Sequence, residues 1–258
     1  MTPRDVEVAG LRVHLNERGE GAPMVVLHHS TGPLWTPFHD ALAEQYAVTA
    51  IDLPGFAQSE RPEDARSPRD LGILTLQAID ALELDEFHLV GLGFGGWVAA
   101  EIATMAGRRL SALTLVGAAG VKPREGAGFI HDPVTAGFVE YVRLGFHDGE
   151  AFDAFFGAEP SKDMIDLWDY SREMTARVTW KPWMWSLVLP TLLRGVTVPA
   201  QVIWGAEDAV VPLDCGEQYA EILPNGHLEV IDGAGHLVEL ERPEAVARLV
   251  TGFAPVAS

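Results

Sequence analysis

Two residues in the second half of the chain could form a general base. Asp208 closes the apolar stretch PAQVIWGAED, and His236 closes the stretch HLEVIDGAGH, 28 positions later. A carboxylate can hold an imidazole in one tautomer and stabilise its protonated form, so an Asp–His pair can take a proton from a substrate or from water. The separation leaves room for one helix and one strand, which would put both side chains at the carboxyl ends of neighbouring strands.

A glycine-rich turn lies upstream of this pair. The stretch FHLVGLGFGGWVAAEIA, residues 87–103, passes from an apolar, strand-like segment through four glycines into a helical pattern. It fits either the dinucleotide motif G-x-G-x-x-G or the nucleophile turn G-x-S-x-G with Gly93 in place of the serine. The dinucleotide motif also requires an acidic residue at the end of the next strand, about 20 residues on. Residues 111–120 contain no Asp or Glu, so nucleotide binding is rejected and no cofactor is expected.

The segments that must position these residues alternate between strand and helix. Apolar, β-branched runs are separated by helical patterns, among them one near residues 67–84 and one that starts at Phe94. Near-continuous apolar strands are typical of an α/β protein with a mostly parallel sheet covered by helices on both faces. The first two runs are expected to form an N-terminal hairpin. The expected strands lie within residues 6–10, 11–19, 23–30, 46–55, 87–93, 110–120, 199–208 and 227–236.

Residues 121–190 differ in character from the rest of the chain. They hold four of the seven tryptophans, Trp183 among them, together with helical periodicity. We expect a helical insertion, whose aromatic side chains either form a small core of their own or cover a ligand site as a cap. The chain would then divide into an α/β core, residues 1–120 and 191–258, and a helical cap, residues 121–190.

Composition narrows the function classes. The net charge of −19 disfavours binding to phosphate backbones or anionic lipid. The single cysteine, Cys215, excludes an internal disulfide framework and fits a reducing compartment. We expect no signal peptide and no membrane span, because no apolar signal-peptide core follows Met1 and no apolar run reaches membrane-spanning length. We therefore expect a soluble, cytoplasmic protein whose partner is a small-molecule substrate, with no nucleic acid and no membrane. The oligomeric state is not readable from the sequence.

The motifs GLGFGGW, GAEDAVVP and GAGHLVELERPE, in this order, resemble the α/β-hydrolase superfamily. The similarity is to its capped group of esterases, C–C bond hydrolases and cofactor-free oxygenases, and it covers essentially the whole chain. It implies an α/β-hydrolase fold with a helical cap between the sixth and seventh strands. It also implies Asp208 and His236 as the catalytic acid and histidine, and the backbone N–H groups of Ser30 and Phe94 as the oxyanion hole. Gly93 stands at the position of the nucleophilic serine.

Two departures from the family pattern change the expected chemistry. Gly93 has no side chain, so an acyl-enzyme cannot form on it, and we expect its missing side chain to open space for one small group. His29 stands where the family motif has a glycine after the first histidine. Because an engineered inactivation would alter one position, this second departure favours a natural replacement at position 93.

The favoured hypothesis is an enzyme in which the His236–Asp208 dyad acts directly, without a covalent intermediate. It would deprotonate water in the space at Gly93, or an acidic group of the substrate. The reaction would be a hydrolysis, a lyase or isomerase step, or a cofactor-free oxygenation. The substrate would be a small, apolar or aromatic carbonyl compound, with His29 and Trp183 among the residues that contact it. Two alternatives stay open. One is a serine esterase or C–C bond hydrolase inactivated by a serine-to-glycine substitution at position 93. The other is a non-catalytic protein that binds a small molecule.

The other chemically capable side chains have simpler explanations. Ser30 could be a displaced nucleophile, but its loop is expected to supply a backbone donor. His28 and His29 are adjacent at a strand end and should point to opposite faces, so that with His236 they lack the spacing of metal ligands. Cys215 lies at a predicted helix start and is expected to be packed there. No metal site is expected.

Overall fold

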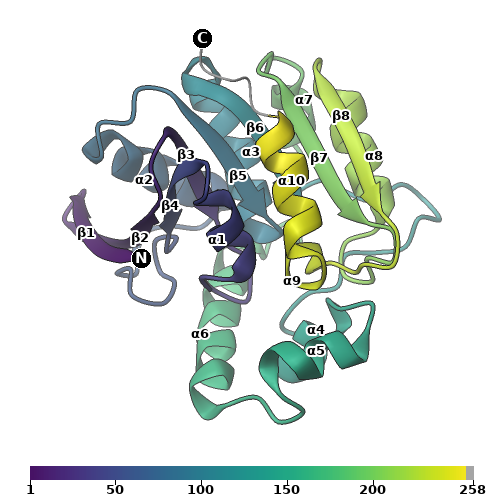
Figure 1. The fold of residues 1–258 in the computed structure, drawn as a ribbon. Coiled ribbons are helices and arrows are strands. Elements are labelled where there is room, and N and C mark those ends of the chain that lie inside the picture. Colours follow the sequence, from purple (N-terminus) through teal and green to yellow (C-terminus); the bar gives the residue numbers. More distant parts are fainter. Residues whose placement is uncertain (254–258) are drawn as a thin grey trace.

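A mixed sheet lies at the centre of the computed structural model, which describes residues 1–253 (Figure 1). Its strands are β1 (Thr2–Val8), β2 (Leu11–Arg18), β3 (Ala22–Leu27), β4 (Tyr46–Ile51), β5 (Phe87–Leu92), β6 (Leu110–Val116), β7 (Ala200–Gly205) and β8 (Gly226–Ile231). The eight strands are ordered β1-β2-β4-β3-β5-β6-β7-β8. The pairs β1–β2 and β2–β4 are antiparallel, and the pairs from β4 to β8 are parallel. The predicted mostly parallel sheet with an N-terminal hairpin is confirmed.

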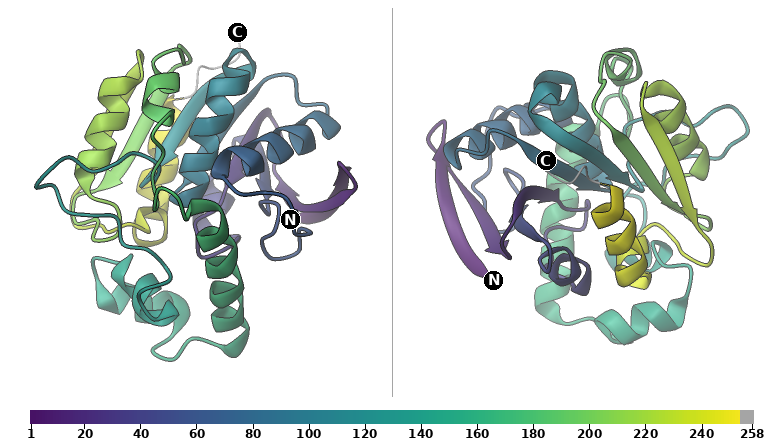
Figure 2. Two further views of the ribbon diagram at one scale, coloured as in Figure 1. Left: turned by 180° about the vertical axis from the view of Figure 1, so that it is seen from behind. Right: turned by 45° about the horizontal axis from the view of Figure 1, so that its top comes forward.

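Helices cover both faces of this sheet (Figures 1 and 2). They are α1 (Pro37–Leu42), α2 (Pro68–Ala81), α3 (Phe94–Ala106), α4 (Phe138–Leu144), α5 (Gly149–Phe156), α6 (Lys162–Thr179), α7 (Leu189–Leu193), α8 (Leu213–Ile222), α9 (Val238–Glu241) and α10 (Pro243–Phe253). One face carries α1 and α10, which pack against each other, and the other carries α2, α3 and α8. None of the helices in residues 1–253 combines the length and apolar character that a bilayer span needs.

The sheet separates two hydrophobic cores. Every residue of β5 and of β7 is buried, as expected for strands covered on both faces. One core includes Phe38 of α1 and Val246 of α10, and the other includes Leu71 of α2 and Ile102 of α3. With both faces covered, the carboxyl ends of the parallel strands are the place where side chains from several strands can converge on a ligand.

The glycine run after β5 lets α3 pack against the strands at close range. A Cβ on Gly95 would lie 2.4 Å from the carbonyl oxygen of His28, and a Cβ on Gly91 would lie 2.5 Å from that of Gly95. A Cβ on Gly96 would lie 2.6 Å from the side chain of Ala118. Contacts this short exclude any side chain, so close packing alone explains three of the four glycines, without a phosphate ligand.

Gly91→Ala should destabilise the fold by about 1–3 kcal/mol, because the added methyl group would overlap backbone atoms of α3 that cannot rotate away. Urea unfolding measures the loss. The matched control is Gly252→Ala in α10, where a Cβ would meet nothing within 4 Å, and where alanine should be neutral or stabilising. Equal unfolding midpoints for the native protein and Gly91→Ala would contradict this account of the packing.

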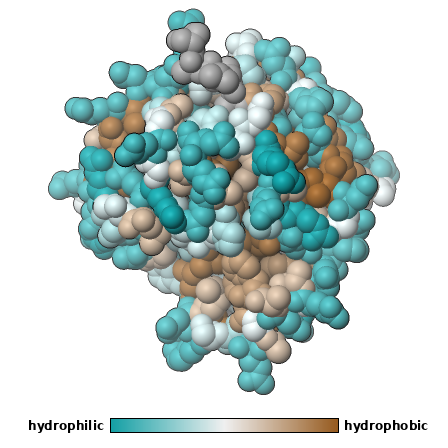
Figure 3. All heavy atoms as spheres, in the orientation of Figure 1, coloured by the Kyte–Doolittle hydropathy of each residue, from teal (hydrophilic) through white to brown (hydrophobic). Residues whose placement is uncertain are grey.

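The segment that holds α4, α5 and α6, between β6 and β7, lies beyond the carboxyl edge of the sheet (Figure 1). This segment shares the hydrophobic core of α2 and α3, to which its buried Trp168 belongs, packed against Phe156. It also reaches the loop after β3, because the Tyr141 hydroxyl lies 3.1 Å from Ser30 Oγ and Thr175 Oγ1 donates to the Ser30 carbonyl at 3.4 Å. Figure 3 shows apolar residues gathered where this segment meets the sheet layer, on a face that is otherwise mainly hydrophilic.

Candidate active site

Asp208 and His236 meet beyond the carboxyl ends of β7 and β8. His236 Nδ1–H donates to Asp208 Oδ2 at 2.9 Å. The other carboxylate oxygen, Oδ1, accepts from the backbone N–H groups of Val210 and Val211, each at 2.8 Å. These bonds hold the carboxylate in place and fix the imidazole tautomer, which leaves Nε2 of His236 as the nitrogen that can exchange a proton.

Burial and charge act on His236 in opposite directions. Its side chain is 5% exposed, and that of Asp208 is fully buried. Burial alone would lower the pKa of His236, but the charge of Asp208, their hydrogen bond and the charge of Glu239 outweigh it, so the pKa is raised above the ordinary 6.5. The raised pKa makes this imidazole a stronger base than a free histidine.

Gly93 lies at the turn between β5 and α3. Its φ of 53° and ψ of −111° form a conformation that glycine adopts freely and that strains other residues. The backbone is anchored on both sides, since Gly93 N–H donates to the Val116 carbonyl at 2.8 Å and Ala119 N–H donates to the Gly93 carbonyl at 3.2 Å. A Cβ on Gly93 would lie 3.1 Å from Nε2 of His236. The turn therefore faces the dyad in the way that a nucleophile turn does.

The space in front of Gly93 is occupied by His29, so the expectation of an open space there was wrong. A Cβ on Gly93 would lie 2.2 Å from Nδ1 of His29 and 3.0 Å from its Cε1. The imidazole thus stands where the first atoms of a serine side chain would lie. The expectation failed because it considered Gly93 alone, whereas a side chain from the loop after β3 fills the gap.

His29 is paired with a carboxylate that was not predicted from the sequence. Its Nε2–H donates to Glu239 Oε1 at 3.1 Å, and both side chains are buried. Burial alone would raise the pKa of Glu239, but the adjacent His29, their hydrogen bond and His236 outweigh it and lower the pKa. The available signal was the position of Glu239, three residues after His236 in HLVELE. Nothing in that stretch distinguishes it from a solvent-exposed glutamate.

The adjacent histidines His28 and His29 have different environments. His28 Nε2 accepts from Leu53 N–H at 3.1 Å, and its Nδ1–H donates to the His29 carbonyl at 2.7 Å. Burial lowers the pKa of His28 to about 3, so it is a neutral, structural residue. In contrast, Nδ1 of His29 has no hydrogen-bond partner among the described residues. The rings of His29 and His236 lie edge to face, with centroids 5.2 Å apart.

The two oxyanion-hole candidates, Ser30 and Phe94, directly follow His29 and Gly93 in the chain. Phe94 is the first residue of α3, where a backbone N–H has no acceptor within the helix and the helix dipole favours negative charge. The Ser30 hydroxyl is hydrogen bonded to that of Tyr141 at 3.1 Å. Because this hydroxyl is engaged with the helical insertion, Ser30 is a poor candidate for a displaced nucleophile.

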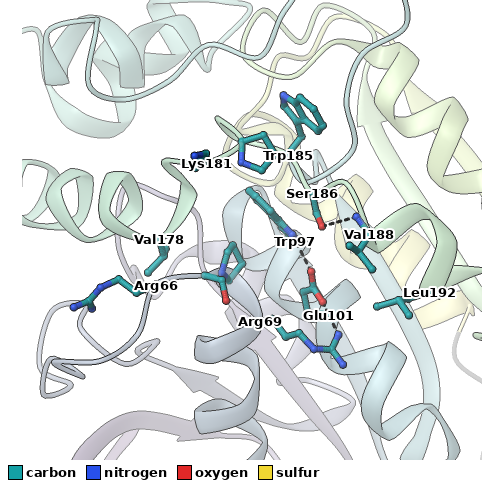
Figure 4. A pocket seen from close by; sticks show the side chains of 13 residues that line it. Arg66, Arg69, Trp97, Glu101, Val178, Lys181, Trp185, Ser186, Val188 and Leu192 are labelled. Carbon is teal, nitrogen blue, oxygen red and sulfur yellow. Dashed lines mark hydrogen bonds and ion pairs between the residues drawn. The ribbon is translucent and has the colours of Figure 1, made fainter.

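The aromatic segment after α6 borders a separate cavity. Trp183 packs edge to face against Trp180, with centroids 5.3 Å apart. Nearby, Trp185 lines a cavity of about 280 Å³, with Trp97 and Glu101 of α3 on another wall (Figure 4). Trp97 Nε1–H donates to the Glu101 carboxylate there at 3.4 Å. The part of Trp183 in substrate binding stays a prediction.

Cys215 lies near the start of α8 and is packed. Its thiol donates to the Val121 carbonyl at 3.4 Å, and burial raises its pKa to about 12, so it is not a reactive thiol. Within residues 1–253, no three His, Cys, Asp or Glu side chains come together as metal ligands. Proton transfer and nucleophilic attack by imidazole are the chemistry that the described side chains at Gly93 can perform.

Comparison with known proteins gives a consistent result. The model of the alpha/beta hydrolase family matches residues 25–249. The chain is 28% identical to the 2-hydroxymuconate semialdehyde hydrolase of Pseudomonas sp. (strain CF600), over 97% of this chain and 93% of that protein. It is 29% identical to the 2-hydroxy-6-oxononadienedioate/2-hydroxy-6-oxononatrienedioate hydrolase of Burkholderia vietnamiensis, over 94% and 91%.

The solved structure of a meta-cleavage product hydrolase from Pseudomonas fluorescens IP01 has the same fold. It superposes with a TM-score of 0.78 at 24% identity, over 97% of this chain and 96% of that one. The family model, the sheet order and the turn at Gly93 all agree: the chain belongs to the α/β-hydrolase family.

Proposed function

We propose that this protein is a hydrolytic enzyme in which the His236–Asp208 dyad acts as a general base without a serine nucleophile. The substrate is a small, apolar or aromatic compound with a carbonyl group. The observation that carries the proposal is the 2.9 Å hydrogen bond between these two buried side chains, beside a turn whose Cβ position lies 3.1 Å from His236 Nε2. This arrangement supports proton removal at the point that a substrate carbonyl would approach.

The environment of the dyad favours catalysis over simple binding. A buried carboxylate and a buried imidazole are costly to desolvate, and perturbed pairs of this kind cluster at sites that transfer protons. A protein that only binds an apolar molecule gains nothing from a base with a raised pKa. The dyad therefore supports the enzyme hypothesis over the non-catalytic one.

The contact between His29 and Gly93 disfavours the hypothesis of an inactivated serine hydrolase. A simple serine-to-glycine substitution requires an ancestor in which a serine fits at position 93. With His29 in place, the Cβ of that serine would lie 2.2 Å from Nδ1. The two positions are complementary to each other, which supports a remodelled site.

The relatives suggest the substrate class. Their names specify a semialdehyde and oxo-dioic acids, which are carbonyl compounds with further acidic groups. We infer that the substrate is a conjugated oxo compound of this kind, whose unsaturated carbon chain forms the apolar part and which also carries an acidic group. Aryl acetates serve as simple probes of the same carbonyl chemistry.

The pH dependence of p-nitrophenyl acetate hydrolysis tests the proposed function. His236 accepts a proton only when neutral, and its pKa is raised above 6.5, so kcat should rise with pH through a value above 6.5. Asp208→Asn removes the charge that raises this pKa. The rise should then move to lower pH, and the plateau should fall by about 10²–10⁴-fold. Identical profiles for the two proteins would contradict the proposal.

A further inference from the structure

A second histidine–carboxylate pair, His29–Glu239, faces the same point in front of Gly93 as the first. We propose that His29 is the nucleophile that replaces the missing serine, and that its Nδ1 forms an acyl-imidazole with the carbonyl substrate. The inference rests on the proposed function, because it assigns the covalent step of the same site. In this scheme, the His236–Asp208 dyad activates the water that releases the acyl group from His29.

The position of His29 supports this role. Its Nδ1 lies 2.2 Å from where a Cβ on Gly93 would be, while His236 Nε2 lies 3.1 Å from the same point. Two ring nitrogens from different loops therefore converge on the space of a serine side chain. In a serine hydrolase, that space holds the attacking atom, next to the Nε2 of the catalytic histidine.

The tautomer of His29 leaves this nitrogen free to attack. In the 3.1 Å bond between His29 Nε2 and Glu239 Oε1, the carboxylate oxygen accepts, so Nε2 of His29 carries the hydrogen. In the neutral imidazole, Nδ1 then has a lone pair in the ring plane. Among the described residues this buried nitrogen has no hydrogen-bond partner, as is also true of one ring nitrogen each of His14 and His88, so no hydrogen bond to the protein has to break before it attacks.

Glu239 does for His29 what Asp208 does for His236. It fixes the ring orientation, and it stabilises the positive charge that an imidazole acquires when Nδ1 is acylated while Nε2 keeps its hydrogen. The acylated ring would otherwise carry an unpaired charge in a buried site, because His29 is 5% exposed. By resemblance, the N–H of Phe94 at the start of α3 stabilises the oxyanion.

The reaction balances with the two pairs alone. The Nδ1 lone pair of His29 bonds to the carbonyl carbon, and the π electrons move to oxygen. Collapse of this tetrahedral species breaks the bond to the leaving group, which takes the Nε2 proton of protonated His236. Neutral His236 then removes a proton from water, and the hydroxide adds to the acyl carbon. Cleavage of the bond between the acyl carbon and Nδ1 then releases the carboxylic acid and restores neutral His29 and protonated His236.

Burst kinetics with p-nitrophenyl acetate test the inference, with rapid acid quench and peptide mass mapping to locate the acetyl group. In the native protein, we expect a burst of p-nitrophenolate and an acetyl group on His29. In His236→Ala the burst should persist, because this leaving group needs no proton. Acetyl-His29 should accumulate in that variant, because water is no longer activated.

Removal of the nucleophile should abolish the burst. We expect His29→Gly to lose it and to lower turnover by about 10²-fold or more. Free imidazole should restore turnover in a concentration-dependent way by entering the vacated space beside Glu239. His29→Gln fills that space and keeps a donor for Glu239 but has no nucleophilic nitrogen, so it should fold and lack the burst. The matched control is His227→Ala, which removes an exposed histidine paired with Glu229 at 2.8 Å.

The outcomes separate this inference from the proposed function. An undiminished burst in His29→Gln, or an acetyl group on any residue other than His29, would overturn the nucleophile assignment. If His236→Ala loses turnover in that case, the general-base function stands. If His236→Ala turns over as fast as the native protein, the general-base function fails, whatever His29 does.

Discussion

Replacing His236 with alanine should lower the steady-state kcat for a carbonyl substrate by about 10²–10⁴-fold, the usual contribution of a positioned general base. The loss follows from the geometry, because Nε2 of His236 is the basic nitrogen of the dyad and Asp208 fixes the ring by accepting from Nδ1–H at 2.9 Å. The measurement is steady-state hydrolysis of a panel of aryl esters and conjugated oxo acids. If His236→Ala turns over at the native rate, the dyad takes no part in the reaction.

Two controls distinguish lost chemistry from lost structure. His236→Gln keeps a polar side chain of similar size and should show the same kinetic loss with a near-native unfolding midpoint. His227→Ala, at an exposed position on β8, should leave both rate and stability unchanged. A kinetic loss in the His227 variant as large as that in His236→Ala would show that the assay reports on something other than this site.

Gly93→Ser should fail to create a serine hydrolase and should destabilise the protein by about 2–6 kcal/mol. This range adds about 1–3 kcal/mol for a non-glycine residue at φ of 53° to about 1–3 kcal/mol for overlap with His29. Urea unfolding gives the first result, and the absence of a gain in aryl acetate hydrolysis gives the second.

Making room for the serine should reverse both effects. In a Glu239→Gln background, which avoids leaving a buried carboxylate unpaired, His29→Gly together with Gly93→Ser removes the 2.2 Å contact. The introduced hydroxyl then lies beside Nε2 of His236. We expect this variant to recover part of the stability and to show a burst from acylation at position 93. If Gly93→Ser alone performs as well, His29 does not block the turn.

The fold and one pair of candidate site residues could be predicted because their signals are local. Strands such as β5 and β7 are short apolar runs, and Asp208 and His236 each close such a run, so sheet topology brings them together. The glycine turn has a motif that could be compared with two known chemistries. In these cases, neighbouring residues in the sequence carry the information.

The second pair could not be predicted because its signal is not local. His29 comes from the loop after β3 and Glu239 from α9, and neither segment indicates that their side chains touch. The same limit explains the error about the space at Gly93. Loss of a side chain predicts a gap only if nothing else fills it, and what fills it is decided by packing between distant segments.

The interlock between positions 29 and 93 also has an evolutionary consequence. Between a serine-dependent ancestor and this protein, the order of the substitutions at positions 29 and 93 matters, because the two possible intermediates differ in stability. A chain with serine at position 93 and histidine at position 29 has a steric clash, since the serine Cβ would lie 2.2 Å from the imidazole. A chain with glycine at both positions has no such clash. The more stable intermediate has glycine at both positions, and in it neither candidate attacking group is present.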